Sequence, residues 1–177
     1  MKRNIWKTIK LGTCYYYGHY WRALREAGCR IDDYVNEAFG MRIFRIAEQE
    51  QEIDLANLSV AELGFEKGAE YHEICQRAVE LGYALCEPED GPALRIQYLD
   101  QPKNENEFCD EELYVGMKPL EIMNASRVFL IRRSGNVLWL HCTQVEYAKR
   151  ERFLDRLGDR PRFHSGCRFV FRCPSGN

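Results

Sequence analysis

The feature that most constrains the fold is a change of hydrophobic period between the two halves of the chain. In the first half, apolar residues recur at the three- and four-residue steps of a helix face, whereas in the second half they alternate along short runs. Side chains return to the same face after about 3.6 residues in a helix and after about two in a strand. A given spacing of apolar residues therefore places them on one face of a helix or on one face of a strand, but not both. We therefore expect helices first and strands afterwards.

Three amphipathic helices are predicted in the first half. The segments 18–28 and 31–40 follow one another closely and each ends at a glycine, a residue that readily adopts the left-handed conformation, so together they predict a helical hairpin. The third helix, Gly68–Gly82, gathers its apolar residues mostly on one face. Ile53–Val60 is a short apolar run that fits a helix or a strand, and we favour a strand.

Strands are predicted in the second half. Leu94, Ile96 and Tyr98 alternate with Arg95 and Gln97, as in a half-buried strand. A glycine-containing turn joins two apolar runs into a β-hairpin, an alternating strand comes near the C-terminus, and a charged helix is expected between them. These elements are Arg127–Arg133 with Val137–Cys142, Arg168–Arg172, and Glu146–Leu157.

This order of elements favours an α+β fold, in which an N-terminal helical hairpin and one further helix pack on a C-terminal antiparallel sheet. At 177 residues the chain is expected to form a single domain over residues 1–177. Its helical part would cover about 14–82 and its mainly β part about 93–173.

A resemblance to other proteins rests on four segments, which are Lys7–Thr13, Ser59–Phe65, Gly91–Tyr98 continuing into Asp100–Pro102, and Leu138–Leu140. Together these segments resemble a family of small uncharacterised bacterial proteins. The resemblance implies a bacterial origin and a single domain, and it implies nothing about chemistry.

Charge is segregated along the chain, although the net charge is only −2. Residues 1–46 carry +5, residues 47–121 carry −14 and residues 122–177 carry +7. Arginines interleaved with aromatic residues in the last segment could bind nucleic acid, or they could simply neutralise the acidic middle. The candidate binding residues in this segment are Arg160, Arg162, Arg168 and Arg172.

Aromatic residues cluster near the N-terminus. Tyr15, Tyr16 and Tyr17 are consecutive, so they cannot all face a core, and they are candidate binding residues for a base or a protein surface. Trp21 follows at helical spacing, and we expect it to close the core.

Motifs for known chemistry are absent from the sequence. There is no phosphate-binding loop, dinucleotide fingerprint, HExxH or CxxC, so we predict no cofactor and no catalytic residues. Eight cysteines lie at irregular intervals along a chain long enough to have its own core, which favours reduced thiols. His164, Cys167 and Cys173 are weak candidates for a zinc site.

The N-terminal segment does not resemble an export signal, because Lys7 and Lys10 interrupt its apolar stretch. No apolar run approaches the about 20 residues that span a membrane, so we expect a cytoplasmic protein without membrane contact. The sequence favours a non-enzymatic binding protein that recognises a protein partner. The alternatives are a nucleic-acid-binding protein that uses the basic C-terminal third, and a small hydrolase or zinc protein.

Overall fold

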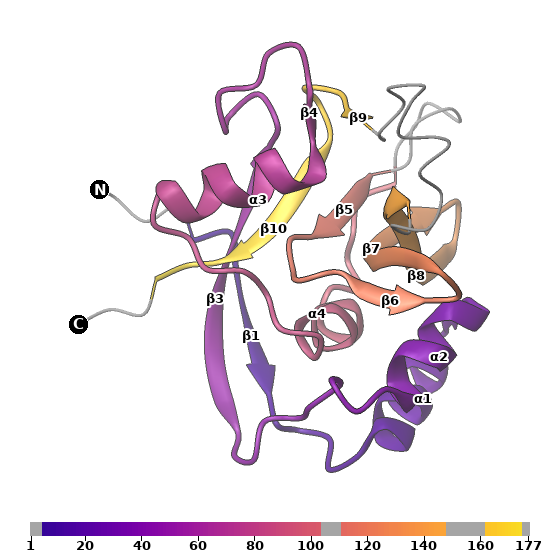
Figure 1. Ribbon diagram of the computed structural model, residues 1–177. Coiled ribbons are helices and arrows are strands. Elements are labelled where there is room, and N and C mark those ends of the chain that lie inside the picture. Colours follow the sequence, from indigo (N-terminus) through magenta and orange to yellow (C-terminus); the bar gives the residue numbers. More distant parts are fainter. Residues whose placement is uncertain (1–4, 104–110, 148–161, 175–177) are drawn as a thin grey trace.

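A curled mixed sheet of eight strands dominates the computed structural model, which describes residues 5–103, 111–147 and 162–174 (Figure 1). Its strands are β1 (Lys7–Leu11), β2 (Cys29–Ile31), β3 (Gln51–Ser59), β5 (Glu112–Val115), β6 (Leu120–Ile122), β7 (Ala125–Ser134), β8 (Val137–Tyr147) and β10 (Arg168–Arg172). The order is β1-β3-β10-β5-β7-β8-β2, and β6 pairs with β7. Two short strands, β4 (Ala69–Glu70) and β9 (Arg162–Phe163), pair separately.

The sheet mixes strand directions and combines both halves of the chain. β10 runs parallel to β5, and β2 runs parallel to β8, whereas the other pairs are antiparallel. The C-terminal strand β10 lies between β3 and β5, so a strand from the first half is hydrogen-bonded to one from the end. The predicted C-terminal antiparallel sheet is therefore wrong, because β1, β2 and β3 all belong to the main sheet.

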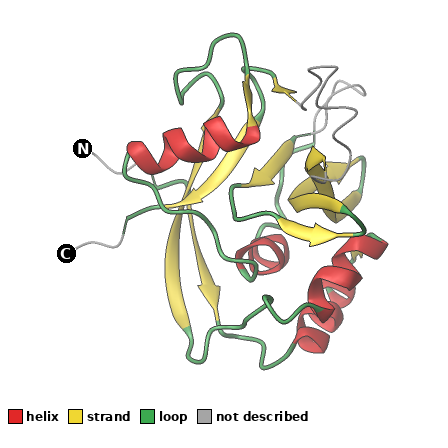
Figure 2. Cartoon of the chain, viewed as in Figure 1, coloured by secondary structure: helices red, strands yellow, loops and turns green. Residues whose placement is uncertain are grey.

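Four helices accompany the strands in the described part of the chain (Figure 2). They are α1 (Tyr17–Glu26), α2 (Asp33–Gly40), α3 (Tyr71–Glu80) and α4 (Asp90–Gln97). The predicted helical hairpin is wrong, because β2 separates α1 from α2 and pairs with β8. Gly28 has the expected left-handed φ of +73°, but it leads into this strand instead of a helix turn.

The helix α4 occupies the segment where the sequence predicts a strand. The strand prediction was wrong because the alternating pattern implies that Arg95 faces solvent, whereas this side chain is fully buried. Its guanidinium donates to Gln101 Oε1 at 2.6 Å and to the carbonyl of Tyr98. The helix packs closely on β7, since a Cβ on Gly91 would lie 2.6 Å from the Phe129 ring. The curled sheet surrounds α4 in Figure 1.

Several predicted elements are confirmed. α3 lies within the predicted helix, and the side chains of Glu70 and Glu73 form a capping box at its start. The hairpin of β7 and β8, the strand β10 and the strand preference for 53–60 are also confirmed. The predicted helix 146–157 begins inside β8, and residues 148–157 lie outside the described part.

Buried apolar side chains from the sheet and from all four helices form one cluster. Seven cysteines of the described residues are free thiols, and five of these seven are buried. No helix in the described ranges is both long enough and apolar enough to cross a membrane.

Candidate functional site

Four exposed aromatic residues lie together where α1 begins, and we call Tyr15, Tyr16, Tyr17 and Trp21 the aromatic surface. Their exposed fractions are 84%, 50%, 56% and 42%. α1 turns Tyr20 and Leu24 into the core, and this leaves the positions four apart at 17 and 21 on its outer side. The expectation that Trp21 closes the core is wrong, since the neighbouring Tyr20 takes that place.

Two rings of the aromatic surface contact one another, and Tyr15, Tyr16 and Trp21 contact charged or polar neighbours. Tyr16 lies edge-on to Tyr17 with 6.2 Å between ring centroids and lies 4.1 Å from His19. The guanidinium of Arg25 stands over the Trp21 ring at 5.4 Å. A hollow of about 340 Å³ is lined by Tyr17, Gly18, Trp21, Asn36 and Phe39. The aromatic surface therefore includes a recess that can receive a side chain.

Three of the four arginines predicted to bind nucleic acid are described, and these three make contacts within the chain. Arg160 lies outside the described residues, and Arg162 donates to the carbonyl of Gly68 at 2.9 Å. Arg172 makes two hydrogen bonds of 2.6 Å to Asp90.

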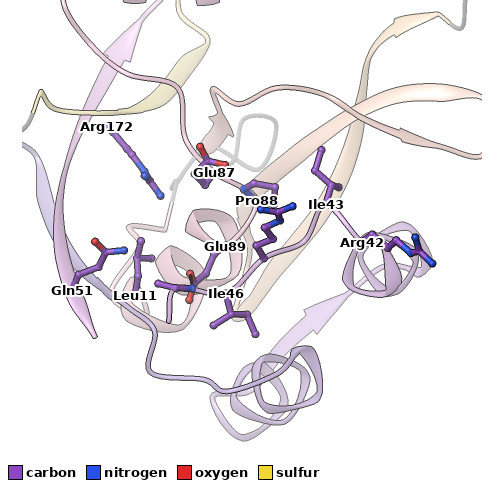
Figure 3. Close-up of a pocket in the computed structure, with 11 residues that line it drawn as sticks. Leu11, Arg42, Ile43, Ile46, Gln51, Glu87, Pro88, Glu89 and Arg172 are labelled. Carbon is purple, nitrogen blue, oxygen red and sulfur yellow. Dashed lines mark hydrogen bonds between the residues drawn. The ribbon is translucent and has the colours of Figure 1, made fainter. Parts of the chain in front are cut away.

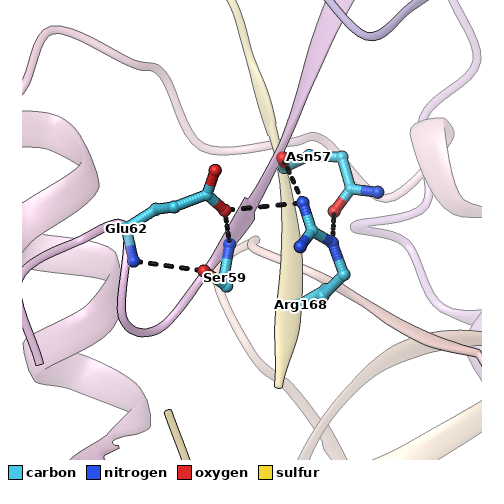
Figure 4. A network of polar contacts seen from close by, with 4 residues as sticks. All are labelled: Asn57, Ser59, Glu62 and Arg168. Carbon is cyan, nitrogen blue, oxygen red and sulfur yellow. Dashed lines mark hydrogen bonds and ion pairs between the residues drawn. The ribbon is translucent and has the colours of Figure 1, made fainter. Parts of the chain in front are cut away.

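Arg168 belongs to a polar network that ties β10 to β3 (Figure 4). It donates to Asn57 Oδ1 at 2.9 Å and lies 3.4 Å from Glu62 Oε2. Hydrogen bonds from the backbone N–H and hydroxyl of Ser59, helped by the charge of Arg168, hold the pKa of Glu62 below its usual value even though partial burial opposes this. Arg168 and Arg172 thus join parts of the fold, and the use of these residues for binding stays a prediction.

The weak zinc candidates are not brought together. Cys167 precedes β10 and Cys173 follows it, and six residues of extended chain separate their backbones by about 20 Å. His164 uses Nδ1 to accept a hydrogen bond from the N–H of Gly166 at 3.1 Å. Within the described ranges, no three His, Cys, Asp or Glu side chains converge on a common point that a metal ion could occupy.

Asp32 and His141 form a pair that sequence analysis did not identify. Asp32 Oδ2 lies 3.2 Å from His141 Nδ1 and accepts the N–H of Cys142 at 3.0 Å, while Oδ1 accepts the N–H of Val35. Burial alone would raise the pKa of Asp32, but these hydrogen bonds outweigh it and lower the pKa. Among the described residues, no hydroxyl or thiol is hydrogen-bonded to His141, so the pair lacks a nucleophile and serves to cap α2.

Sequence analysis also missed two buried acids at the start of α4, Glu89 and Asp90, which are only 2% and 1% exposed. Glu89 accepts hydrogen bonds from the N–H of Gly12 at 2.9 Å, the hydroxyl of Tyr20 at 2.6 Å and the N–H of Ala47 at 2.7 Å. A cavity of about 620 Å³ lies beside Glu89 (Figure 3). The turn-forming residues of 87–92 give no sign of this burial, which only the long-range partners of Glu89 and Asp90 reveal.

Comparisons of the chain with protein-family models, with curated proteins and with solved structures found no match. The resemblance to a bacterial family stays a prediction, and the functional argument rests on the residues described above.

Proposed function

We propose that this chain is a non-enzymatic binding protein that recognises a protein partner through the aromatic surface. The observation that carries this proposal is the exposure of four neighbouring large rings, from 42% for Trp21 to 84% for Tyr15. Single exposed apolar residues are common on folded proteins, but a contiguous group of them is typical of an interaction site.

The fold does not depend on these rings for its core. On α1 the buried positions are Tyr20 and Leu24, and both are at most 1% exposed. Tyr15 and Tyr16 precede the helix, and Tyr16 at its N-terminal boundary makes no side-chain capping bond. The exposed rings therefore add little to the stability of the isolated chain and leave their apolar area to be buried by something else.

A protein partner suits this chemistry. Tyr and Trp are enriched among the residues that dominate binding energy, because a large ring with two rotatable bonds buries much area at low entropic cost. Each Å² of apolar surface removed from water contributes about 25 cal/mol. The recess between Trp21 and Phe39 adds a place where a side chain of the partner can insert. Residues that dominate binding energy usually occupy pockets of this kind.

Site-specific photo-crosslinking in the cells that make the protein tests the proposal. A benzophenone amino acid replaces Tyr17, and the same amino acid replaces Val79 as the matched control, because Val79 is 52% exposed on α3, away from α1 (Figure 1). We expect a discrete protein adduct from position 17 that position 79 does not give, with its partner identified by mass spectrometry. Equal adducts from both positions, none from position 17, or an adduct of two copies of this chain would contradict the proposal.

Nucleic acid is a second candidate, favoured by the arginines beside the rings. Arg22 and Arg25 are exposed on α1, and Arg25 stands over Trp21, so bases could stack while phosphates meet the cations. Binding that falls steeply with salt, and falls further in Arg22→Ala, would favour this candidate. A protein partner held by aromatic rings would be much less sensitive to salt.

A further inference from the structure

A cavity of about 620 Å³ opens where the end of β1, the segment after α2, the start of α4 and the end of β10 meet. Figure 3 shows the labelled side chains of Leu11, Gln51, Glu87, Glu89 and Arg172 arranged around it, while Arg42 extends away at its outer end. Volumes of this size are typical of small-molecule sites. The cavity lies apart from the aromatic surface, and nothing in the proposed function uses it.

Glu89 holds the walls of this cavity in place. The buried carboxylate is hydrogen-bonded to the N–H of Gly12 after β1, to the hydroxyl of Tyr20 on α1 and to the N–H of Ala47 in the segment after α2. Burying a carboxylate is costly, and here three neutral donors from three segments satisfy it. The close approach of the walls requires glycine at position 12, because a Cβ there would lie 2.4 Å from the carbonyl oxygen of Gln49. The cavity is therefore preformed.

Two arginines offer donors to a ligand. Asp90 fixes Arg172 through Nε and Nη2, each at 2.6 Å, and no contact with a described residue engages Nη1. Arg45 is exposed and makes no hydrogen bond or ion pair with a described residue. A guanidinium presents parallel N–H groups that match the two oxygens of a carboxylate, and one held rigidly by a second acid loses less entropy on binding.

The charge balance favours a ligand with no more than a single negative charge. The lining holds Arg42, Arg45, Arg172, Glu87 and Glu89, and the buried carboxylate of Asp90 pairs with Arg172, so these six groups together carry no net charge. A doubly charged phosphate would meet the repulsion of both acids. The remaining wall is apolar, since Leu11, Ile43, Ile46 and Pro88 also line the cavity, and it suits a hydrocarbon body.

We propose that this cavity binds a small organic monocarboxylate with an apolar body, its carboxylate held by Arg172 and Arg45 and its hydrocarbon part lying against Leu11 and Ile46. Such a ligand could be a simple carboxylic acid or an amino acid. The two differ by an ammonium group. The carboxylate of Glu87 is exposed and has no hydrogen bond or ion pair to a described residue, so it is available to accept hydrogen bonds from such a group.

Titration of the ¹³C-methyl-labelled protein, followed by NMR, tests this proposal with four probes: 4-methylpentanoate, leucine, 3-methylbutylamine and inorganic phosphate. We expect saturable shifts of the methyl signals of Leu11, Ile43 and Ile46 with 4-methylpentanoate or leucine. The amine and phosphate should bind at least about tenfold more weakly, which corresponds to about 1.4 kcal/mol. Tighter binding of leucine than of 4-methylpentanoate would identify the amino acid as the source, and the reverse order would identify the simple acid.

Variants locate the site. Arg45→Ala should weaken the carboxylate about five- to tenfold, the loss expected for one charge-assisted hydrogen bond in a partly exposed site. Arg22→Ala is the matched control, because Arg22 is also exposed but lies on α1 outside the lining. The proposal is overturned by the absence of saturable binding for both carboxylates, by phosphate binding as tightly as they do, or by equal weakening in the two variants.

Discussion

The aromatic surface at the start of α1 and the buried acids at the start of α4 differ in how they depart from the usual rule that apolar side chains are buried and charged side chains are exposed. Glu89 and Asp90 are charged but lie inside, and the chain itself supplies a partner for every oxygen they present. Tyr15 and Tyr17 are largely apolar but lie outside, and the described chain covers less than half of either side chain. The comparison teaches that burial with full internal pairing indicates a structural role, whereas the exposed rings contribute little to the fold and are the surface that the proposed partner would bury.

The largest effect should come from breaking the buried ion pair. Asp90 is 1% exposed, and Arg172→Ala would remove the cation that contacts it; removing one partner of a buried pair costs about 3 to 5 kcal/mol of unfolding free energy. Urea denaturation followed by circular dichroism measures this loss. Arg168→Ala is the comparison on the same strand, because its partner Glu62 is 49% exposed and Arg168 otherwise donates to Asn57, so a smaller loss of about 1 to 3 kcal/mol is expected. Similar losses of unfolding free energy in both variants would show that the burial of Asp90 does not account for the stability that the Arg172–Asp90 pair contributes.

A smaller loss is expected from Glu89→Gln, which keeps the shape of the side chain but replaces one acceptor oxygen with a donor. One of the three donors that contact Glu89 then faces another donor, and an unsatisfied buried group costs about 1 to 3 kcal/mol. Glu87→Gln is the control, since Glu87 is exposed and a surface change of this kind stays within about 0.5 kcal/mol. The same denaturation experiment compares them, and an unchanged stability of Glu89→Gln would contradict the role assigned to this carboxylate.

Sequence patterns predicted the elements whose burial is local and missed those that depend on distant partners. The helix of Tyr71, Ile74 and Ala78 and the hairpin around Gly135 were both predicted, because each forms its own pattern of buried and exposed positions. Arg95 was read as solvent-facing, yet its two Nη atoms donate to Gln101 and to backbone carbonyls inside the fold, so a helix appeared where a strand was expected.

The same distinction applies to the candidate sites. The three consecutive tyrosines could be identified because geometry forbids burying all of them, and each is exposed by half or more. The cavity beside Glu89 could not be found from sequence, because its lining comes from four separate segments, and the side chain of Glu89 is held by residues 42, 69 and 77 positions away. A sequence pattern reports a residue's neighbours along one element but not those across the fold.

Asp32 allows the effect of pH to be predicted. Its pKa in the folded protein is lowered, so ionised Asp32 contributes stability above its unfolded pKa of about 3.9, and this contribution is lost as the pH falls through the lower folded value. Asp32→Asn should therefore be less stable than the parent by about 1 kcal/mol at pH 7, because hydrogen bonds to a charged acceptor are replaced by weaker ones. The gap should narrow below about pH 4, where the carboxylate of the parent begins to be protonated.

Denaturation midpoints measured from pH 7 down to pH 3 check this prediction. Asp33→Asn is the control, because Asp33 is exposed in the same turn and is not bonded to His141. A gap between Asp32→Asn and the parent that stays constant over this range would argue against an ionised Asp32 as the source of the stability.

The smallest effect on stability is expected at the aromatic surface, and a pair of tyrosines makes the comparison sharp. Tyr15→Ser should change the free energy of unfolding by no more than about 0.5 kcal/mol, because its ring is 84% exposed. Tyr20→Phe removes only a hydroxyl, but that hydroxyl is buried and donates to the carboxylate of Glu89 at 2.6 Å, so a loss of about 1.5 to 3 kcal/mol is expected. If Tyr15→Ser proved the more destabilising of the two, the exposed rings would be part of the fold and would no longer be free to meet a partner.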